Sequence, residues 1–174
     1  MDSIVKWLLA LFFAKVMLMT NEEGPTSEEF HKKIAIETNN AIWPTLDKED
    51  PEQEELDDAL QMAFTSRYHW GIIGEPINLA RADYMISRVY SSMKMPELAL
   101  HHADRCLEIT KQTGRGDWDL AFAYEAITRA YAVAGNEEKY EEYNKKTKEA
   151  IEDIADEKDK SIVEGELNKI IFPP

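Results

Sequence analysis

Arginine and glutamate side chains recur at helical spacing in the middle of this chain of 174 residues. Arg81 and Arg88 are seven residues apart, and Glu125 precedes Arg129 by four. Residues at these separations lie on one face of an α-helix. The planar guanidinium group binds a carboxylate through two parallel hydrogen bonds. Arg81, Arg88 and Arg129 are therefore candidate donors on a surface that would hold a carboxylate.

Tyr84 and Phe122 lie close to these positions and would add apolar contact to the same surface. A structural interpretation competes with ligand binding. Glu125 stands before Arg129 in the order that favours an ion pair within one helix, worth about 0.2–0.5 kcal/mol. Glu125 could also bridge to Arg88 on a neighbouring helix. Both interpretations can hold together, with a ligand carboxylate competing for the same arginines.

A second group of polar and aromatic side chains, Arg67, His69 and Trp70, falls near an expected helix end. It could form the aromatic mouth of the binding surface. Alternatively, its basic groups interact with the negative end of the helix dipole, while Trp70 packs under the turn expected at residues 71–76. The structural alternative is favoured.

Metal binding has one weak signal. His102 and Cys106 stand four residues apart, a spacing that can bring two ligands together on a helix. Two ligands do not complete a site, and His31 or His69 would have to arrive from other helices. A buried thiol that packs as a small hydrophobic group is the more ordinary interpretation, so no metal is expected.

Catalytic motifs are missing from the sequence, which contains no G-x-S-x-G, no phosphate-binding glycine loop and no H-E-x-x-H. His69, His102 and Glu125, together with Asp83, could form an acid–base group only if folding brought them together. We therefore expect no enzymatic activity and no cofactor. A small metal- or metabolite-binding protein or enzyme built on these residues is the alternative.

Composition and charge limit the partners. The chain has 44% hydrophobic and 31% charged residues, which is typical of a soluble globular protein, and a net charge of −14. All six arginines lie within residues 59–136, between two acidic ends. Nucleic acid is not expected as a partner, because phosphate binding needs clustered basic residues. The single cysteine excludes an intrachain disulfide and favours a cytoplasmic protein.

Residues 1–20 form an apolar extension that does not resemble the rest of the chain. Its apolar run is shorter than the roughly twenty residues of a membrane span, and Lys15 interrupts it. One hypothesis places the true start at Met17 or Met19, upstream of a single domain at residues 21–174. The alternatives are an apolar helix covering one end of the domain or a weak membrane anchor.

Capping residues, prolines and glycines divide the remainder into helices. They are expected at about 27–43, 51–68, 77–93, 96–112, 117–133, 137–155 and 160–171. No stretch alternates apolar and polar residues over the length of a strand. The chain is therefore predicted to be all-α.

An internal repeat relates residues 79–90 to residues 120–131, forty-one positions later, with six of twelve residues identical. A period near forty in a helical chain indicates stacked helix pairs. Small and bulky positions in the first unit are Ala80, Ile86, Ser87, Tyr90, Ala99, Ala103, Cys106 and Leu107. Those in the second are Ala121, Ile127, Thr128, Tyr131 and Gly135, whereas Tyr140, Asn144 and Thr147 stand where small residues are expected.

This pattern resembles the tetratricopeptide repeat, in its longer variety found in kinesin light chains, over about residues 52–150. Some segments are also similar to small bacterial tetratricopeptide-like proteins without assigned function. The resemblance implies a short right-handed α-solenoid of about three antiparallel helix hairpins with a C-terminal capping helix. Its concave groove would be lined by Arg81, Tyr84, Arg88, Phe122, Glu125 and Arg129.

The expected function is a scaffold that binds a protein or peptide, in particular one that offers a carboxylate. A self-associating structural module is a further alternative, because a short solenoid leaves apolar end faces unpaired. The expected state is a monomer or a weak homodimer.

Overall fold

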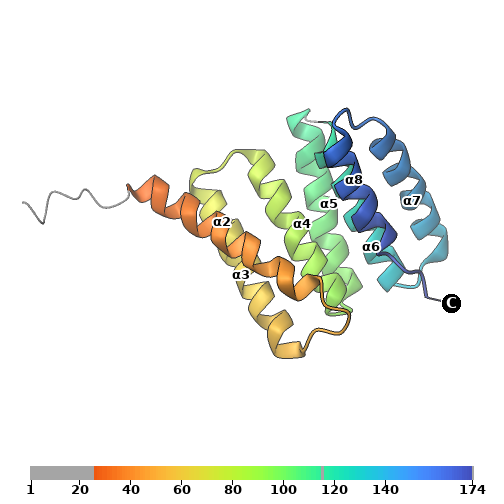
Figure 1. Cartoon of the computed structure of the whole chain (residues 1–174), viewed down its shortest axis with the longest axis horizontal. Helices are drawn as coiled ribbons and strands as arrows, with labels where there is room; N and C mark the ends of the chain where they lie inside the picture. The colour runs from red at the N-terminus through yellow and green to blue at the C-terminus, as the bar shows by residue number, and fades with distance from the viewer. Residues whose placement is uncertain (1–25, 115, 174) are drawn as a thin grey trace, which may run out of the picture. The chain divides into compact units, whose positions relative to one another are not determined.

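The computed structural model describes residues 26–114 and 116–173, and every regular element in these ranges is an α-helix (Figure 1). The helices are α2 (Ser27–Leu46), α3 (Gln53–Ile73), α4 (Pro76–Ser92), α5 (Pro96–Thr113), α6 (Trp118–Val133), α7 (Glu137–Glu152) and α8 (Glu157–Asn168). The all-α prediction is thus confirmed for the described ranges. None of the helices found there is long and apolar enough to cross a bilayer. The predicted extension at residues 1–20 lies outside the described part of the chain.

Several predicted helix ends are wrong: α7 ends at residue 152 rather than 155, α8 spans 157–168 rather than 160–171, and α3 and α2 both run further than expected. α3 continues through Gly71 to Ile73, and the helix stops where Gly74 adopts an extended backbone. A Cβ at Gly74 would lie 2.6 Å from the Trp70 carbonyl oxygen, so this stop requires glycine. α2 also passes Pro44, because Asp47 N–H still donates to the Trp43 carbonyl oxygen at 2.9 Å.

The turns after α4 and α6 share the same hydrogen bonds at a separation of forty-one residues. Met95 N–H donates to the Tyr90 carbonyl at 2.9 Å. Forty-one residues later, Asn136 N–H donates to the Tyr131 carbonyl at 3.1 Å. Lys94 (φ 59°) and Gly135 (φ 66°) both take the left-handed conformation that closes such a helix end. Lysine therefore occupies a backbone position that favours glycine.

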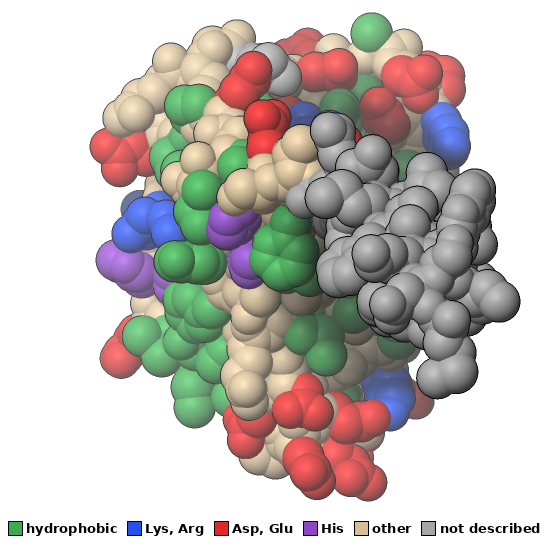
Figure 2. Space-filling model, turned by 90° about the vertical axis from the view of Figure 1, so that its left-hand side faces the viewer, with side chains coloured by type: hydrophobic (Ala, Val, Ile, Leu, Met, Phe, Trp, Pro, Cys, Tyr) green, Lys and Arg blue, Asp and Glu red, His purple; other side chains and the backbone are tan. Residues whose placement is uncertain are grey.

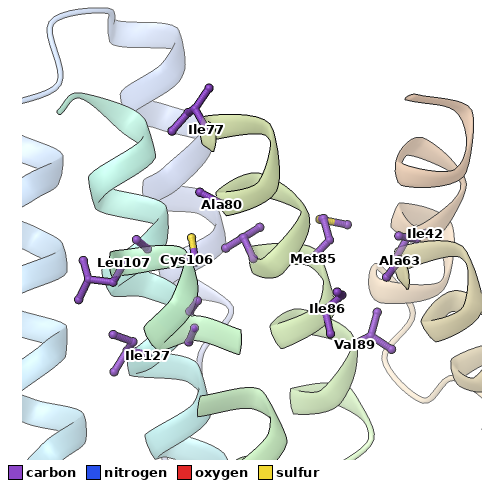
Figure 3. Packing of buried hydrophobic residues seen from close by; sticks show 14 of the residues in the cluster. Ile42, Ala63, Ile77, Ala80, Met85, Ile86, Val89, Cys106, Leu107 and Ile127 are labelled. Carbon is purple, nitrogen blue, oxygen red and sulfur yellow. The ribbon is translucent and has the colours of Figure 1, made fainter. Parts of the chain in front are cut away.

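Residues 31–174 form one compact unit, in which each helix from α3 to α7 packs against the next. Figure 1 shows α4, α5 and α6 side by side. The alternate helices α4 and α6 are also in contact, as are α6 and α8. The main core fills these contacts with alanines and branched residues, among them Ile86, Val89 and Ile127 (Figure 3). Small side chains at the contacts let the helix backbones approach closely.

Buried hydroxyl groups form hydrogen bonds within two helix pairs, α4 with α5 and α6 with α7. Ser87 Oγ donates to the Ala99 carbonyl at 2.9 Å between α4 and α5. Thr128 and Thr147 bond through their hydroxyls at 3.0 Å between α6 and α7. Thr147 stands where the repeat predicts a small residue, yet it is fully buried. The second pair is therefore closely packed at this point.

Candidate binding site

Arg88 is buried, with 3% of the residue exposed, although the repeat predicts that it faces outward. The reason is α8, which brings Glu166 Oε2 to 2.8 Å from Arg88 Nη1. The same Nη1 donates to the Tyr84 hydroxyl at 2.7 Å. Arg88 is therefore paired within its own chain, and a ligand carboxylate would have to compete with Glu166 for it.

Arg129 is held in the same way. Its Nε donates to Glu125 Oε1 at 2.9 Å, which confirms the predicted ion pair within α6. Its Nη2 donates to the backbone carbonyl of Glu166 at 2.9 Å. Glu125 is fully buried and contributes to the interior rather than to a groove surface. Arg88 and Arg129 thus both anchor α8.

These contacts and burial shift the pKa values of Glu166 and Tyr84. Burial alone would raise the pKa of Glu166, but Arg88 and Lys169 hold it below its usual value. Burial also raises the pKa of the Tyr84 hydroxyl. Glu166 therefore stays ionised and paired with Arg88 over the neutral range.

Arg81 differs from the other two arginines because 40% of its side chain remains exposed. Two of its nitrogen atoms donate to Asp119: Nε to Oδ1 at 2.8 Å and Nη2 to Oδ2 at 3.0 Å. Its guanidinium carbon lies 4.2 Å from the centroid of the Trp118 ring. Arg81 is the predicted groove arginine that a partner can still reach.

The predicted groove mouth does not form one surface. Arg67 turns toward α4, where its Nε donates to Asp83 Oδ1 at 2.9 Å. His69 instead lies 2.7 Å from His31, measured between the two Nδ1 atoms, and Trp70 is half-buried. On the face drawn in Figure 2, hydrophobic side chains flank the histidine atoms near the centre, whereas the histidine at the left edge lies beside a lysine or arginine.

Asp83 is the centre of a separate buried cluster. His102 Nδ1 lies 2.8 Å from its Oδ1, and Arg105 Nε lies 3.6 Å from its Oδ2. Burial by itself would raise the pKa of Asp83, but the bonds from His102 and Arg67 lower it overall. The Tyr90 ring stacks on His102 at a centroid distance of 5.8 Å, so aromatic packing encloses the imidazole.

The acid–base group considered from sequence is only partly assembled. His102 meets Asp83, whereas His69 bonds to His31 and Glu125 bonds to Arg129. Among the described residues, no three potential ligands come together in a way that could hold a metal ion. Cys106 is buried, and burial raises the pKa of its thiol, as suits a packing residue.

A pocket of about 470 Å³ opens between α2, α6 and α8. Its lining consists of Trp43, Asp47, Trp118, Phe122, Asp159, Ile162, Glu166 and Lys169. A smaller pocket of about 160 Å³ adjoins it, shares its three aromatic residues and reaches Arg81 and Tyr84. The two together form the aromatic pocket, named for Trp43, Trp118 and Phe122 in its lining.

Sequence patterns predicted Phe122, Arg81 and Tyr84 in this region but missed Trp43, Trp118 and the contribution of α8 to the pocket, although a helix was expected at 160–171. A weak signal was available, because tryptophan is enriched at binding sites and Trp118 opens a helix after a glycine-containing loop. The contribution of α8 had no local signal. Comparisons with protein-family models, with curated proteins and with solved structures find no match for this chain.

Proposed function

We propose that this chain is a short right-handed α-solenoid of the tetratricopeptide kind that binds a segment of another protein in the aromatic pocket. The observation that carries the proposal is the pocket itself, where aromatic side chains from two helices meet an exposed isoleucine from a third. Volumes of about 300–1,000 Å³ are typical of ligand sites.

The solenoid is supported by the order of helix contacts. Neighbouring helices pair along the chain, and α4 with α6 and α6 with α8 also touch, as they do when hairpins stack. The turns after α4 and α6 also support a solenoid, because they join the helices of each hairpin with the same backbone geometry. In this arrangement α2, α4, α6 and α8 supply the inner face, and the pocket lies on it.

Peptide binding is supported by the chemistry of the lining. Trp43, Trp118 and Phe122 are only partly buried, and Ile162 is 49% exposed. Large aromatic side chains of this kind dominate interface energetics when a partner excludes water from them. Arg81 lies at the edge, where a partner carboxylate would compete with Asp119 for it, whereas Arg88 and Arg129 serve to hold α8 in place.

Selection of random peptides displayed on phage tests the proposal. Ile162→Lys places a positive charge at the pocket without disturbing the core, because Ile162 is exposed. Leu98→Lys is the matched control, since Leu98 is 46% exposed on α5 and does not line the pocket. Enriched peptides are expected to bind the wild type and Leu98→Lys but to lose about tenfold or more in affinity for Ile162→Lys. Equal binding to all three proteins would reject the pocket.

Self-association is a second candidate, favoured by one observation. Three large apolar side chains recur every four residues on α3 and are between 41% and 67% exposed: Phe64, Tyr68 and Ile72. An apolar stripe of this kind can pair with a second copy. Sedimentation over a concentration series should show a dimer that Tyr68→Lys disrupts. A monomer at every concentration would remove this candidate.

A further inference from the structure

We infer that the aromatic pocket accepts a positively charged alkylammonium group, such as a lysine side chain or a small quaternary ammonium compound. This inference rests on the proposed function, because it names the chemistry that the same pocket recognises. Three features carry it: the orientation of the aromatic rings, an acid without a basic partner, and the balance of charge around the opening.

The rings provide faces for a cation. Trp118 and Phe122 meet nearly at right angles, with an interplanar angle of 89° and centroids 5.8 Å apart, so they form a corner. Trp43 completes the lining from α2. The negative face of an aromatic ring attracts ammonium and guanidinium groups, and several rings around one cavity select quaternary ammonium ligands.

The same tryptophans already attract cations from their own chain. The guanidinium carbon of Arg88 lies 5.5 Å from the centroid of Trp43, and that of Arg81 lies 4.2 Å from Trp118. Each of these arginines is also neutralised by a carboxylate, Arg88 by Glu166 and Arg81 by Asp119. Their charges therefore oppose an incoming cation only weakly.

Asp159 supplies a carboxylate that is free to pair. It lines the pocket from the first turn of α8 and is partly buried. Within residues 26–114 and 116–173, no lysine, arginine or histidine lies within ion-pair distance of it. The other two acids of the lining are already engaged, because Lys169 bonds to Asp47 at 3.1 Å and to Glu166 at 2.8 Å.

The charge around the opening also favours a cation. Three acids and one lysine line the pocket. The whole chain carries a net charge of −14, and residues 137–174 hold twelve acids against seven lysines. A cleft lined mainly by one sign of charge concentrates ligands of the opposite sign.

Choline and its uncharged carbon isostere, 3,3-dimethylbutan-1-ol, form a matched pair of probes for the cation. Titration into ¹⁵N-labelled protein is followed through the indole N–H signals, assigned with Trp→Phe variants. Choline is expected to shift Trp43 and Trp118 but not Trp70, which does not line the aromatic pocket. The isostere should bind about tenfold more weakly, because it lacks the charge that the rings attract.

A charge-matched pair of variants tests Asp159. Asp159→Asn should weaken choline binding about fivefold, as expected for loss of one partly exposed ion pair. Glu157→Gln removes the same charge from the same turn of α8, where Glu157 is exposed and outside the pocket, and should leave binding unchanged. Comparison of choline with Nα-acetyl-lysine amide then separates a quaternary ammonium ligand from a peptide lysine, according to which binds more tightly.

Equal affinity for choline and the isostere, or an unchanged affinity in Asp159→Asn, would overturn the inference. The two proposals fail separately. If phage-selected peptides bind at the pocket without lysine and choline does not bind, the cation is rejected and peptide binding stands. If choline binds as expected and no peptide is selected, the cation site stands and the peptide-binding function is rejected.

Discussion

Glu166 Oε2 lies 2.8 Å from Arg88 Nη1 and joins α8 to α4 across 78 positions of sequence. Only 4% of the arginine side chain and 11% of the glutamate side chain remain exposed. The carboxylate that the arginine spacing predicts for a partner is thus supplied by the last helix of the same chain. Arg88 and Arg129 hold α8 in place, and the aromatic pocket lies beside this helix.

Glu166→Gln should lower the free energy of unfolding by about 2–3 kcal/mol, because it leaves Arg88 buried without its charge partner. Urea denaturation followed by circular dichroism measures the change. Glu164→Gln is the control on the same helix, since Glu164 is exposed, and its effect should stay within about 0.5 kcal/mol. Equal effects of the two substitutions would mean that the ion pair does not stabilise the fold.

Asp83 should make stability depend on acid pH. Its folded-state pKa is lowered by His102 and Arg67 against the effect of burial, so its contribution is present at neutral pH and is lost as the carboxylate protonates. The difference in unfolding free energy between the wild type and Asp83→Asn should therefore shrink as the pH falls below about 4. Asp58→Asn, at an exposed site on α3, should show almost no difference at any pH. A gap for Asp83→Asn that stays constant from neutral to acid pH would contradict the prediction.

Cys106 should not react with a thiol reagent in the folded protein. The thiolate is the reactive form, and burial both raises the pKa of Cys106 and blocks access to it. Ellman's reagent should release colour only after unfolding in guanidinium chloride, to one equivalent per chain because Cys106 is the only cysteine. Rapid reaction in buffer would show that the core between α4 and α5 opens.

The paired turns give opposite predictions for equivalent positions. Gly135→Ala should destabilise and Lys94→Gly should stabilise the protein, each by about 1 kcal/mol, because only glycine adopts a positive φ without strain. Gly165→Ala is the control inside α8, where alanine should stabilise the helix by up to about 1 kcal/mol. Thermal unfolding measures all three. Destabilisation by Lys94→Gly would show that its side chain matters more than its backbone conformation.

Local signals predicted most of the helices but not how α8 docks. Pro96 begins α5 as expected, because proline suits the first turn of a helix whatever surrounds it. Pro76 begins α4 for the same reason, although sequence patterns place it in the turn expected at residues 71–76. The ion pair between Glu125 and Arg129 was also predictable, since both residues lie on one helix. Burial of Arg88 was not, because it depends on where α8 lies after several intervening turns.

The lining of the pocket could not be predicted from the sequence for a similar reason. Trp43 and Trp118 are seventy-five residues apart, on helices with no shared repeat position. Spacing within one helix carries no information about such a pair. The forty-one-residue periodicity drew attention to Arg88 and Arg129, and both of these contact α8 rather than line the pocket.

Photo-cross-linking from position 162 tests whether a peptide binds in the aromatic pocket. The photoreactive amino acid p-benzoylphenylalanine replaces Ile162 at the pocket or, as the control, the equally exposed Leu98 on α5. A phage-selected peptide carrying biotin is then irradiated with each protein. The pocket predicts a covalent adduct from position 162 and none from position 98. An adduct from position 98 alone, while the peptide still binds, would contradict it.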